Sequence, residues 1–344
     1  MGVAATASGE RKCYVHVGTH KTGTTSIQWF LRNNRALLAA HGVLIPRSGR
    51  SKNDAGHHNL TQELLASPEF APERGGLAEF VDELKGSVLP AACISCEDFS
   101  LLSGNPDALV RLRDAIVAGG YAPVIVVYLR PQISYLVSVY AEIVKNGNRT
   151  PFSVYAREIV EHGSFLWNGL PGPPFRYDLL LANFAAVFGA GAIVARRYRG
   201  GAPNSALLES IASIVSGKPI DAKLFAFPSV RTNPSSTFGG VLRQFGTDLG
   251  ADDLRFAPLN LGQTVRLAAR FVRSNLIVAR CYGPWVPPCE LRDVVLALPI
   301  RGSFRWTRAL RLARRALAAL TPSHDDLPRP NLDSVAPRKP TAMP

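Results

Sequence analysis

The feature that most constrains the fold is an uninterrupted apolar segment at 123–129, with the sequence PVIVVYL. A strand that is apolar on both faces must be covered on both faces, as the inner strands of parallel sheets are. Shorter strand-like segments occur at 12–17, 43–46, 91–95 and 192–198, and segments with the apolar spacing of helices separate them. This alternation predicts an α/β fold with a central, mostly parallel sheet flanked by helices.

The helical segments have apolar residues three and four positions apart. Those between and after the strands lie at 25–41, 76–84, 111–118, 131–144, 152–159, 177–188 and 207–215. Beyond about residue 225 the strand signals end, and helices are predicted at 238–249, 265–279 and 301–320. We therefore expect a flexible leader at 1–11, one domain at 12–320 with a helical C-terminal portion, and a disordered, proline-rich tail at 321–344.

The chain is basic. Its 344 residues include 39 Lys and Arg against 26 Asp and Glu, which gives a formal net charge of +13. Such an excess favours an anionic partner, for example a nucleotide, a sulfated or phosphorylated glycan, or an anionic membrane. The basic residues are spread along the chain and no helix–turn–helix, RNP or zinc-finger pattern occurs, so we expect no nucleic-acid partner.

The cysteines indicate a reducing compartment. They are odd in number and scattered, at Cys13, Cys93, Cys96, Cys281 and Cys289, which argues against a disulfide framework and predicts a cytoplasmic protein. Cys93 and Cys96 have the spacing of a redox motif, but they fall in a predicted buried strand and are interpreted as small core residues. Because no second cysteine pair or histidine pair completes a zinc site, we expect no metal.

A glycine-rich loop lies between the first predicted strand and the first predicted helix. Its residues are Gly18, Thr19, His20, Lys21, Thr22, Gly23, Thr24 and Thr25. Glycines let backbone N–H groups point inward, the helix N-terminus adds partial positive charge, and the hydroxyls of Thr22, Thr24 and Thr25 can donate. The glycines have the separation of a phosphate-binding loop, but Thr24 stands where its lysine is expected and Lys21 lies inside the loop instead. This loop predicts an anion site that does not suit Mg²⁺-ATP.

Arg130 and Ser138 form a second candidate anion site. Arg130 ends the apolar strand, and Pro131 and a helical segment with Ser138 and Tyr140 follow it. Ligands bind at the carboxyl ends of strands in open α/β sheets. A guanidinium there can form two hydrogen bonds to a phosphate, and Ser138, two helical turns later, can share that phosphate.

Together, these motifs resemble those of the sulfotransferases that use 3′-phosphoadenosine 5′-phosphosulfate (PAPS), in their bacterial type. Lys21-Thr22-Gly23-Thr24-Thr25 is similar to the family's 5′-phosphosulfate loop, Lys-x-Gly-Thr-Thr, and Arg130 with Ser138 is similar to its 3′-phosphate motif. The resemblance covers about 12–200, with smaller similarities at 177–180, 188–189 and 196–198. Arg231, in a polar segment at 231–235, is expected to help close over the nucleotide.

The resemblance implies a P-loop-like sulfotransferase fold and the transfer of a sulfuryl group from PAPS to an acceptor hydroxyl or amine, without a metal. Such a displacement needs a base for the acceptor and a cation for the leaving phosphate, and Lys21 is expected to be that cation. Glu97, at the end of the strand at 91–95, is one candidate base and would need a pKa raised by burial. His57 or His58, in a loop at 47–58 that we expect to be exposed, is the other, with an ordinary pKa of about 6.5.

The acceptor is expected to be a carbohydrate or a lipid-linked glycan, bound by loops at 47–59 and 145–174 that include Trp167. The predicted helix at 301–320 is basic and amphipathic, with Arg305, Arg308 and Arg311 on one side. It either packs on the domain with its basic face in solvent or makes peripheral contact with an anionic membrane.

Two other classes of function stay open. A Mg²⁺-dependent phosphotransferase or nucleotide kinase would use Glu97 or Asp98 to hold its metal. A non-catalytic anion- or glycan-binding module would keep the loop and lack a working base.

Overall fold

The computed structural model describes residues 9–53, 55–148, 150–167, 170–198, 204–220, 224–226 and 261–282. The predictions for Arg231, for the helices at 238–249 and 301–320, and for the tail at 321–344 concern residues outside these ranges. Among the described helices, none is both long and apolar enough to cross a bilayer.

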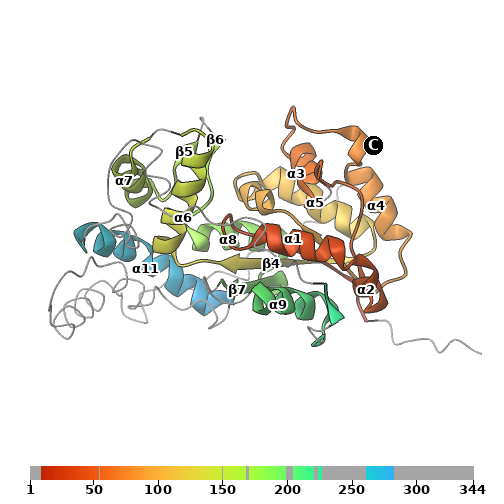
Figure 1. Ribbon diagram of the computed structural model, residues 1–344. Coiled ribbons are helices and arrows are strands. Elements are labelled where there is room, and N and C mark those ends of the chain that lie inside the picture. Colours follow the sequence, from red (N-terminus) through yellow and green to blue (C-terminus); the bar gives the residue numbers. More distant parts are fainter. Residues whose placement is uncertain are drawn as a thin grey trace, which may run out of the picture.

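A five-stranded parallel sheet forms the centre of the molecule (Figure 1). Its strands are β1 (Lys12–His16), β2 (Val43–Leu44), β3 (Ala91–Ser95), β4 (Ala122–Leu129) and β7 (Ile193–Arg197), in the order β2-β3-β1-β4-β7. Each neighbouring pair runs parallel, with β1 between β3 and β4. The predicted α/β fold with a parallel sheet is confirmed. A short antiparallel hairpin, β5 (Leu166–Trp167) with β6 (Leu170–Pro171), was not predicted.

Helices cover both faces of the sheet. They are α1 (Thr24–Asn33), α2 (Arg35–Ala40), α3 (His58–Leu64), α4 (Leu77–Lys85), α5 (Pro106–Ala118), α6 (Gln132–Lys145), α7 (Phe152–His162), α8 (Tyr177–Phe188), α9 (Asn204–Ser216) and α11 (Leu261–Tyr282), with short 3₁₀ helices η1 (Pro72–Arg74), η2 (Glu97–Gly104) and η3 (Ala190–Ala192). Figure 1 shows α3, α4 and α5 on one side of the sheet and α9 on the other.

The two cores follow from the alternation of side chains along β4. Ile125 and Val127 pack with residues of α3, α4, α5 and α8, whereas Val126 and Tyr128 pack with residues of α1, α2 and α9. Since successive side chains of a strand point to opposite faces, a strand covered by helices on both sides must be apolar throughout. The segment at 123–129 therefore required this two-sided arrangement.

The predicted helix at 25–41 is two helices, α1 and α2, which meet at Asn34. The Asn34 amide nitrogen donates to the carbonyl oxygens of Phe30 and Ala226, and its amide oxygen accepts from the Ala226 N–H. Asparagine often competes with helix continuation because its side chain can bond to backbone groups. Here the Asn34 side chain bonds to the Ala226 backbone, so the segment 224–226 packs where α1 ends and α2 begins.

The expectation that 47–58 is an exposed loop is wrong for its buried residues and for its last residue. Arg50 and His57 are buried, and His58 begins α3, which was not predicted. Arg50 Nε donates to the Pro46 carbonyl oxygen at 2.7 Å, and the His57 N–H donates to the Ser95 carbonyl oxygen at 2.9 Å. The His57 contact holds the segment against β3 and spans 38 positions, whereas the Arg50 contact is local.

Candidate active site

The site lies where β3, β1 and β4 end side by side. Because the three strands are parallel and adjacent, their carboxyl ends share one edge of the sheet. Glu97 follows β3, the loop at 18–25 follows β1, and Arg130 follows β4. The chain passes from β3 on one side of β1 to β4 on the other, which makes this edge the place where ligands bind in open α/β sheets.

The loop requires glycine at both ends. Gly18 has φ +60°, and a Cβ there would lie 2.8 Å from Thr24 Cγ2 and 3.1 Å from the Glu97 Cα. Gly23 has φ +77°, and a Cβ there would lie 2.6 Å from Leu207 Cδ2. Positive φ disfavours other residues at both positions, and at Gly18 the Glu97 backbone also leaves little room for a Cβ. The close approach of Gly18 also places the loop directly against the backbone of Glu97.

Two threonine hydroxyls stabilise the loop from within. Thr19 Oγ1 donates to the Tyr128 carbonyl oxygen at 3.2 Å, and Thr22 Oγ1 donates to the Thr19 carbonyl oxygen at 2.5 Å. The Thr22 hydroxyl is therefore engaged inside the loop, and the expectation that it donates to an anion stays a prediction. Gly23 precedes α1 without a side chain to cap it, so the first N–H groups of the helix are available to an anion.

Lys21 adopts a left-handed backbone conformation, with φ +62°. Its ammonium group lies 3.1 Å from Glu142 Oε2 on α6, and its side chain is 16% exposed. A non-glycine residue in this region of φ and ψ is uncommon and is typical of functional loops. Glu142 was not predicted as a site residue, since it is 121 positions from Lys21 in the sequence.

Arg130 contacts the loop directly. Its Nη1 donates to the Lys21 carbonyl oxygen at 3.1 Å and to Ser138 Oγ at 3.0 Å, and its Nε donates to Ser134 Oγ at 3.2 Å. Burial lowers the pKa of this guanidinium, and no carboxylate within the described part of the chain forms an ion pair with it. A largely buried cation whose partners are all neutral has the electrostatics of an anion-binding group.

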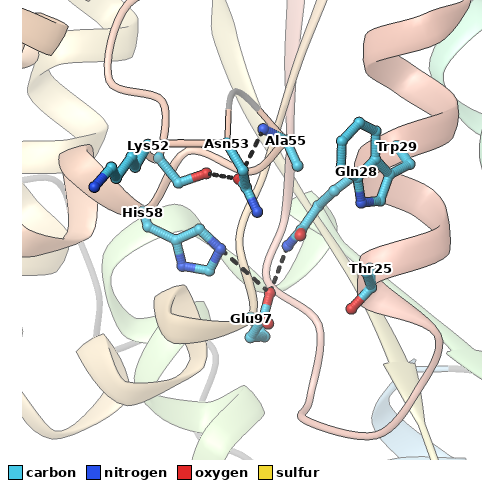
Figure 2. Close-up of a pocket in the computed structure, with 9 residues that line it drawn as sticks. Thr25, Gln28, Trp29, Lys52, Asn53, Ala55, His58 and Glu97 are labelled. Atoms are coloured by element: carbon cyan, nitrogen blue, oxygen red, sulfur yellow. Dashed lines mark hydrogen bonds and ion pairs between the residues drawn. The ribbon is translucent and has the colours of Figure 1, made fainter. Parts of the chain in front are cut away.

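Glu97 faces a pocket of about 610 Å³. The pocket is lined by Thr25, Gln28, Trp29, Ser51, Lys52, Asn53, Ala55, His58 and Glu97. Figure 2 shows Gln28 from one side and His58 from the other converging on Glu97. Gln28 Nε2 donates to Glu97 Oε2, and His58 Nε2 lies 3.9 Å from the same oxygen. Of the two loops predicted to bind the acceptor, the one at 47–59 contributes to this pocket, whereas no described residue of 145–174 lines it.

His58 belongs to a chain of polar contacts. Its Nδ1 lies 3.1 Å from Asp98 Oδ2 and 3.1 Å from Cys96 Sγ, and the other oxygen of Asp98 lies 3.4 Å from Nε2 of His20 in the loop. Burial opposes a charge on His58, but the Cys96 sulfur, the bond to Asp98 and the nearby Glu97 outweigh it and raise the pKa of His58 to about 11. Asp98 is partly exposed, and although its partial burial opposes a charge, its bonds to His20 and His58 lower its pKa.

His57, the other predicted histidine base, lies outside the pocket. It is 1% exposed, its Nδ1 accepts from the Ser95 N–H at 3.1 Å, and its Nε2 lies 3.2 Å from the Pro46 carbonyl oxygen. Burial, with the nearby Arg50, lowers the pKa of His57 to about 3. With both ring nitrogens occupied, His57 holds the segment 46–57 against β3 and cannot reach an acceptor. Glu97 and His58 are the predicted bases that face the pocket.

Cys93 and Cys96 are both fully buried, and they pack in the two different cores on opposite sides of the sheet. Their thiols therefore do not face one another as a redox pair requires. Burial raises the pKa of both thiols, that of Cys93 to about 12. The interpretation of the pair as core residues agrees with this placement.

No protein-family model matches the chain, and no curated protein matches it by sequence. Among solved structures, the crystal structure of a sulfotransferase from Alicyclobacillus acidocaldarius is similar, with 15% sequence identity and a TM-score of 0.45. The similar region covers 79% of this chain and 96% of that one. Similarity at this level does not establish an activity, which has to be inferred from the site residues themselves.

Proposed function

We propose that the protein is a sulfotransferase that moves a sulfuryl group from PAPS to a hydroxyl of a carbohydrate acceptor. The observation that carries the proposal is the hydrogen bond between Arg130 and the backbone of Lys21. Through this bond the Arg130 guanidinium, which has no carboxylate partner among the described residues, lies against the loop at 18–25. The first N–H groups of α1, at the end of that loop, are available to an anion. One adenosine nucleotide with phosphates at both its 5′ and 3′ positions can use both groups at once.

The loop at 18–25 and Lys21 would bind the 5′-phosphosulfate. The backbone N–H groups at the start of α1 meet the phosphate, and the Lys21 ammonium leaves Glu142 to neutralise the charge that develops on the departing phosphate. Arg130 and Ser138 would bind the 3′-phosphate. The phosphate would give Arg130 a charged acceptor in place of the neutral Lys21 carbonyl oxygen and Ser138 hydroxyl. This arrangement favours PAPS over nucleotides that lack a 3′-phosphate.

Glu97 is the base that these contacts favour. Nδ1 of His58 is engaged by Asp98 and Cys96 and Nε2 faces Glu97, whereas the Glu97 carboxylate lines the pocket where an acceptor would bind. In the transfer, the acceptor oxygen forms a bond to sulfur as its proton passes to Glu97. The bond between sulfur and the bridging oxygen breaks, and adenosine 3′,5′-bisphosphate leaves with its new negative charge beside Lys21.

The pocket supports a carbohydrate as acceptor. Its wall combines an aromatic side chain, Trp29, with hydroxyl and amide side chains such as Ser51, Gln28 and Asn53. Its volume of about 610 Å³ lies within the usual range for small-molecule sites. Thr25 and Glu97 both line it, so an acceptor bound there lies between the proposed base and the start of α1.

The rival phosphotransferase is less compatible with the carboxylates of the site. Asp98 is engaged by His20 and His58, and Glu97 is engaged by Gln28 and His58. Mg²⁺ prefers oxygen ligands in octahedral geometry and usually keeps several waters. The imidazole and thiol groups beside these carboxylates suit Mg²⁺ poorly, because Mg²⁺ takes oxygen ligands.

Thermal unfolding with adenosine 3′,5′-bisphosphate or ADP tests the donor assignment. A ligand at 100 times its Kd stabilises the native state by about 2.7 kcal/mol, so we expect the bisphosphate to raise Tm at concentrations where ADP does not. R130K should remove this preference. R113K is the matched control, because Arg113 is a partly exposed arginine that pairs with Asp114 away from the site. Equal stabilisation by the two nucleotides in the unmodified protein would reject PAPS as donor.

Transfer itself is tested with PAPS and a panel of mono- and disaccharides in the presence of EDTA. We expect a sulfated sugar and a stoichiometric amount of adenosine 3′,5′-bisphosphate. Turnover that requires added Mg²⁺, or a phosphorylated product from ATP, would instead favour the phosphotransferase.

A further inference from the structure

We propose that His58, Cys96 and Glu97 form a binding site for a thiophilic divalent cation of the Zn²⁺ type, and that an ion bound there inhibits the enzyme. The binding site stands on the geometry of these three side chains alone. Its inhibitory effect rests on the proposed function, in which Glu97 is the base.

The three residues offer a nitrogen, a sulfur and an oxygen ligand that lie within 4.8 Å of one another. His58 Nδ1 is 3.1 Å from Cys96 Sγ, and His58 Nε2 is 3.9 Å from Glu97 Oε2. In a tetrahedral zinc site, bonds of about 2.0 Å to nitrogen and 2.3 Å to sulfur place the ligand atoms about 3.3–3.6 Å apart. Because the Cys96 sulfur lies near Nδ1 and the Glu97 carboxylate lies near Nε2, the His58 ring must turn so that one of its nitrogens can share an ion with both.

The types of ligand determine the type of ion. A thiolate and an imidazole suit Zn²⁺ and other soft or borderline cations, whereas Mg²⁺ and Ca²⁺ take oxygen ligands. Cys96 thus distinguishes this site from the magnesium site that a kinase would need. On binding, the Cys96 thiol and His58 each release a proton to solvent, so that a thiolate and a neutral imidazole coordinate the ion.

The surroundings supply access and support. His58 and Glu97 line the pocket, so an ion can enter from solvent and a water can complete its coordination (Figure 2). Gln28 donates to the Glu97 carboxylate and holds it in place.

The ion would act by competition. A Glu97 oxygen bound to Zn²⁺ cannot take the proton of an acceptor hydroxyl, and the ion lies in the pocket that the acceptor uses. A chelator should reverse the effect, because no covalent change occurs.

The experiment is a titration of the full-length protein with Cd²⁺, whose bond to a thiolate gives a charge-transfer absorption band, and with Zn²⁺ in competition with a chromophoric chelator. C96S and C93S form a matched pair, since both cysteines are fully buried near the end of the same strand but face opposite cores. We expect C93S to keep the band and the zinc affinity of the unmodified protein. C96S should lose the band and bind Zn²⁺ more than about 10-fold less tightly.

Equal metal binding by C96S and C93S, or no thiolate band in the unmodified protein, would overturn the site. Circular dichroism checks the fold of each variant; if C96S does not fold, H58N in the same titration should show the loss. For the inhibitory effect, the ratio of transfer rates with and without Zn²⁺ is compared between C93S and C96S. A thiolate band that depends on Cys96 in a protein without any transfer activity would uphold the site and reject the proposed function.

Discussion

The two halves of the candidate site are built in different ways. On the proposed donor side, hydrogen bonds to backbone carbonyl oxygens fix the loop at 18–25, and Arg130 donates one of them. On the acceptor side, the pocket is made of side chains from α1, from 51–58 and from Glu97. The comparison suggests that the donor half is preorganised by its backbone, whereas the acceptor half depends on side chains that can be changed one by one.

Replacing Glu97, the proposed base, should have the largest effect, because it should reduce transfer without reducing nucleotide binding. E97Q keeps the shape of the side chain but cannot accept a proton, so the transfer rate should fall by about 10²–10⁴-fold. Stabilisation by adenosine 3′,5′-bisphosphate should be unchanged, because Glu97 does not contact the proposed nucleotide groups. Initial rates and thermal shifts measure the two effects, and a parallel loss of nucleotide binding would mean that the halves are not independent.

G18A should damage both halves together. Strain at positive φ and the collision with Thr24 and the Glu97 backbone should destabilise the protein by about 1–3 kcal/mol and weaken nucleotide binding. G147A is the control for strain alone, since Gly147 has φ +91° but nothing within 4 Å of its missing Cβ. Denaturant unfolding compares the two variants. If they lose the same stability, the contact between the loop and Glu97 has no energetic importance.

Ser138 and Ser134 allow a finer test within the donor half. Both lie on α6 and accept a hydrogen bond from Arg130, Ser138 through Nη1 and Ser134 through Nε. S138A should weaken binding of adenosine 3′,5′-bisphosphate by about 1 kcal/mol, or roughly 5-fold, with a smaller effect on ADP. Calorimetric titration of S138A and S134A measures the difference. A larger effect of S134A would show that Ser134, and not Ser138, binds the 3′-phosphate.

The smallest effect is expected from E142Q. A partly exposed ion pair stabilises a protein by less than about 1 kcal/mol, and Glu142 competes with the donor for Lys21. E142Q should therefore leave Tm nearly unchanged and raise nucleotide affinity by a few-fold. E158Q, which alters an exposed pair with His162, should change neither quantity. A marked loss of affinity in E142Q would show that Glu142 positions Lys21 rather than restraining it.

Local patterns predicted the sheet and the elements that carry the donor half. The strand at 91–95 and the helix at 177–188 have the predicted bounds, and the loop and Arg130 lie at the strand ends where the alternation placed them. Those features depend on neighbouring residues, which a single sequence displays. The roles of Lys21, Arg130 and Glu97 stay predictions; the structure adds that the three lie at one edge.

The acceptor half was less predictable because no local motif marks the side chains that form its pocket. Gln28 meets Glu97 across 69 positions and His58 meets Asp98 across 40. Neither contact leaves a periodic pattern. For the same reason His57 and His58 were equivalent in the sequence, although one is buried against β3 and the other faces the pocket.

Asp98 has a consequence for the order in which substrates add. One of its oxygens meets His20 of the loop and the other meets His58 beside the acceptor pocket. A single rigid carboxylate cannot turn toward one imidazole without turning away from the other. In the proposed reaction, a nucleotide that draws His20 away would free Asp98 to turn toward His58, and kinetics with dead-end inhibitors should then show a compulsory order with the nucleotide first.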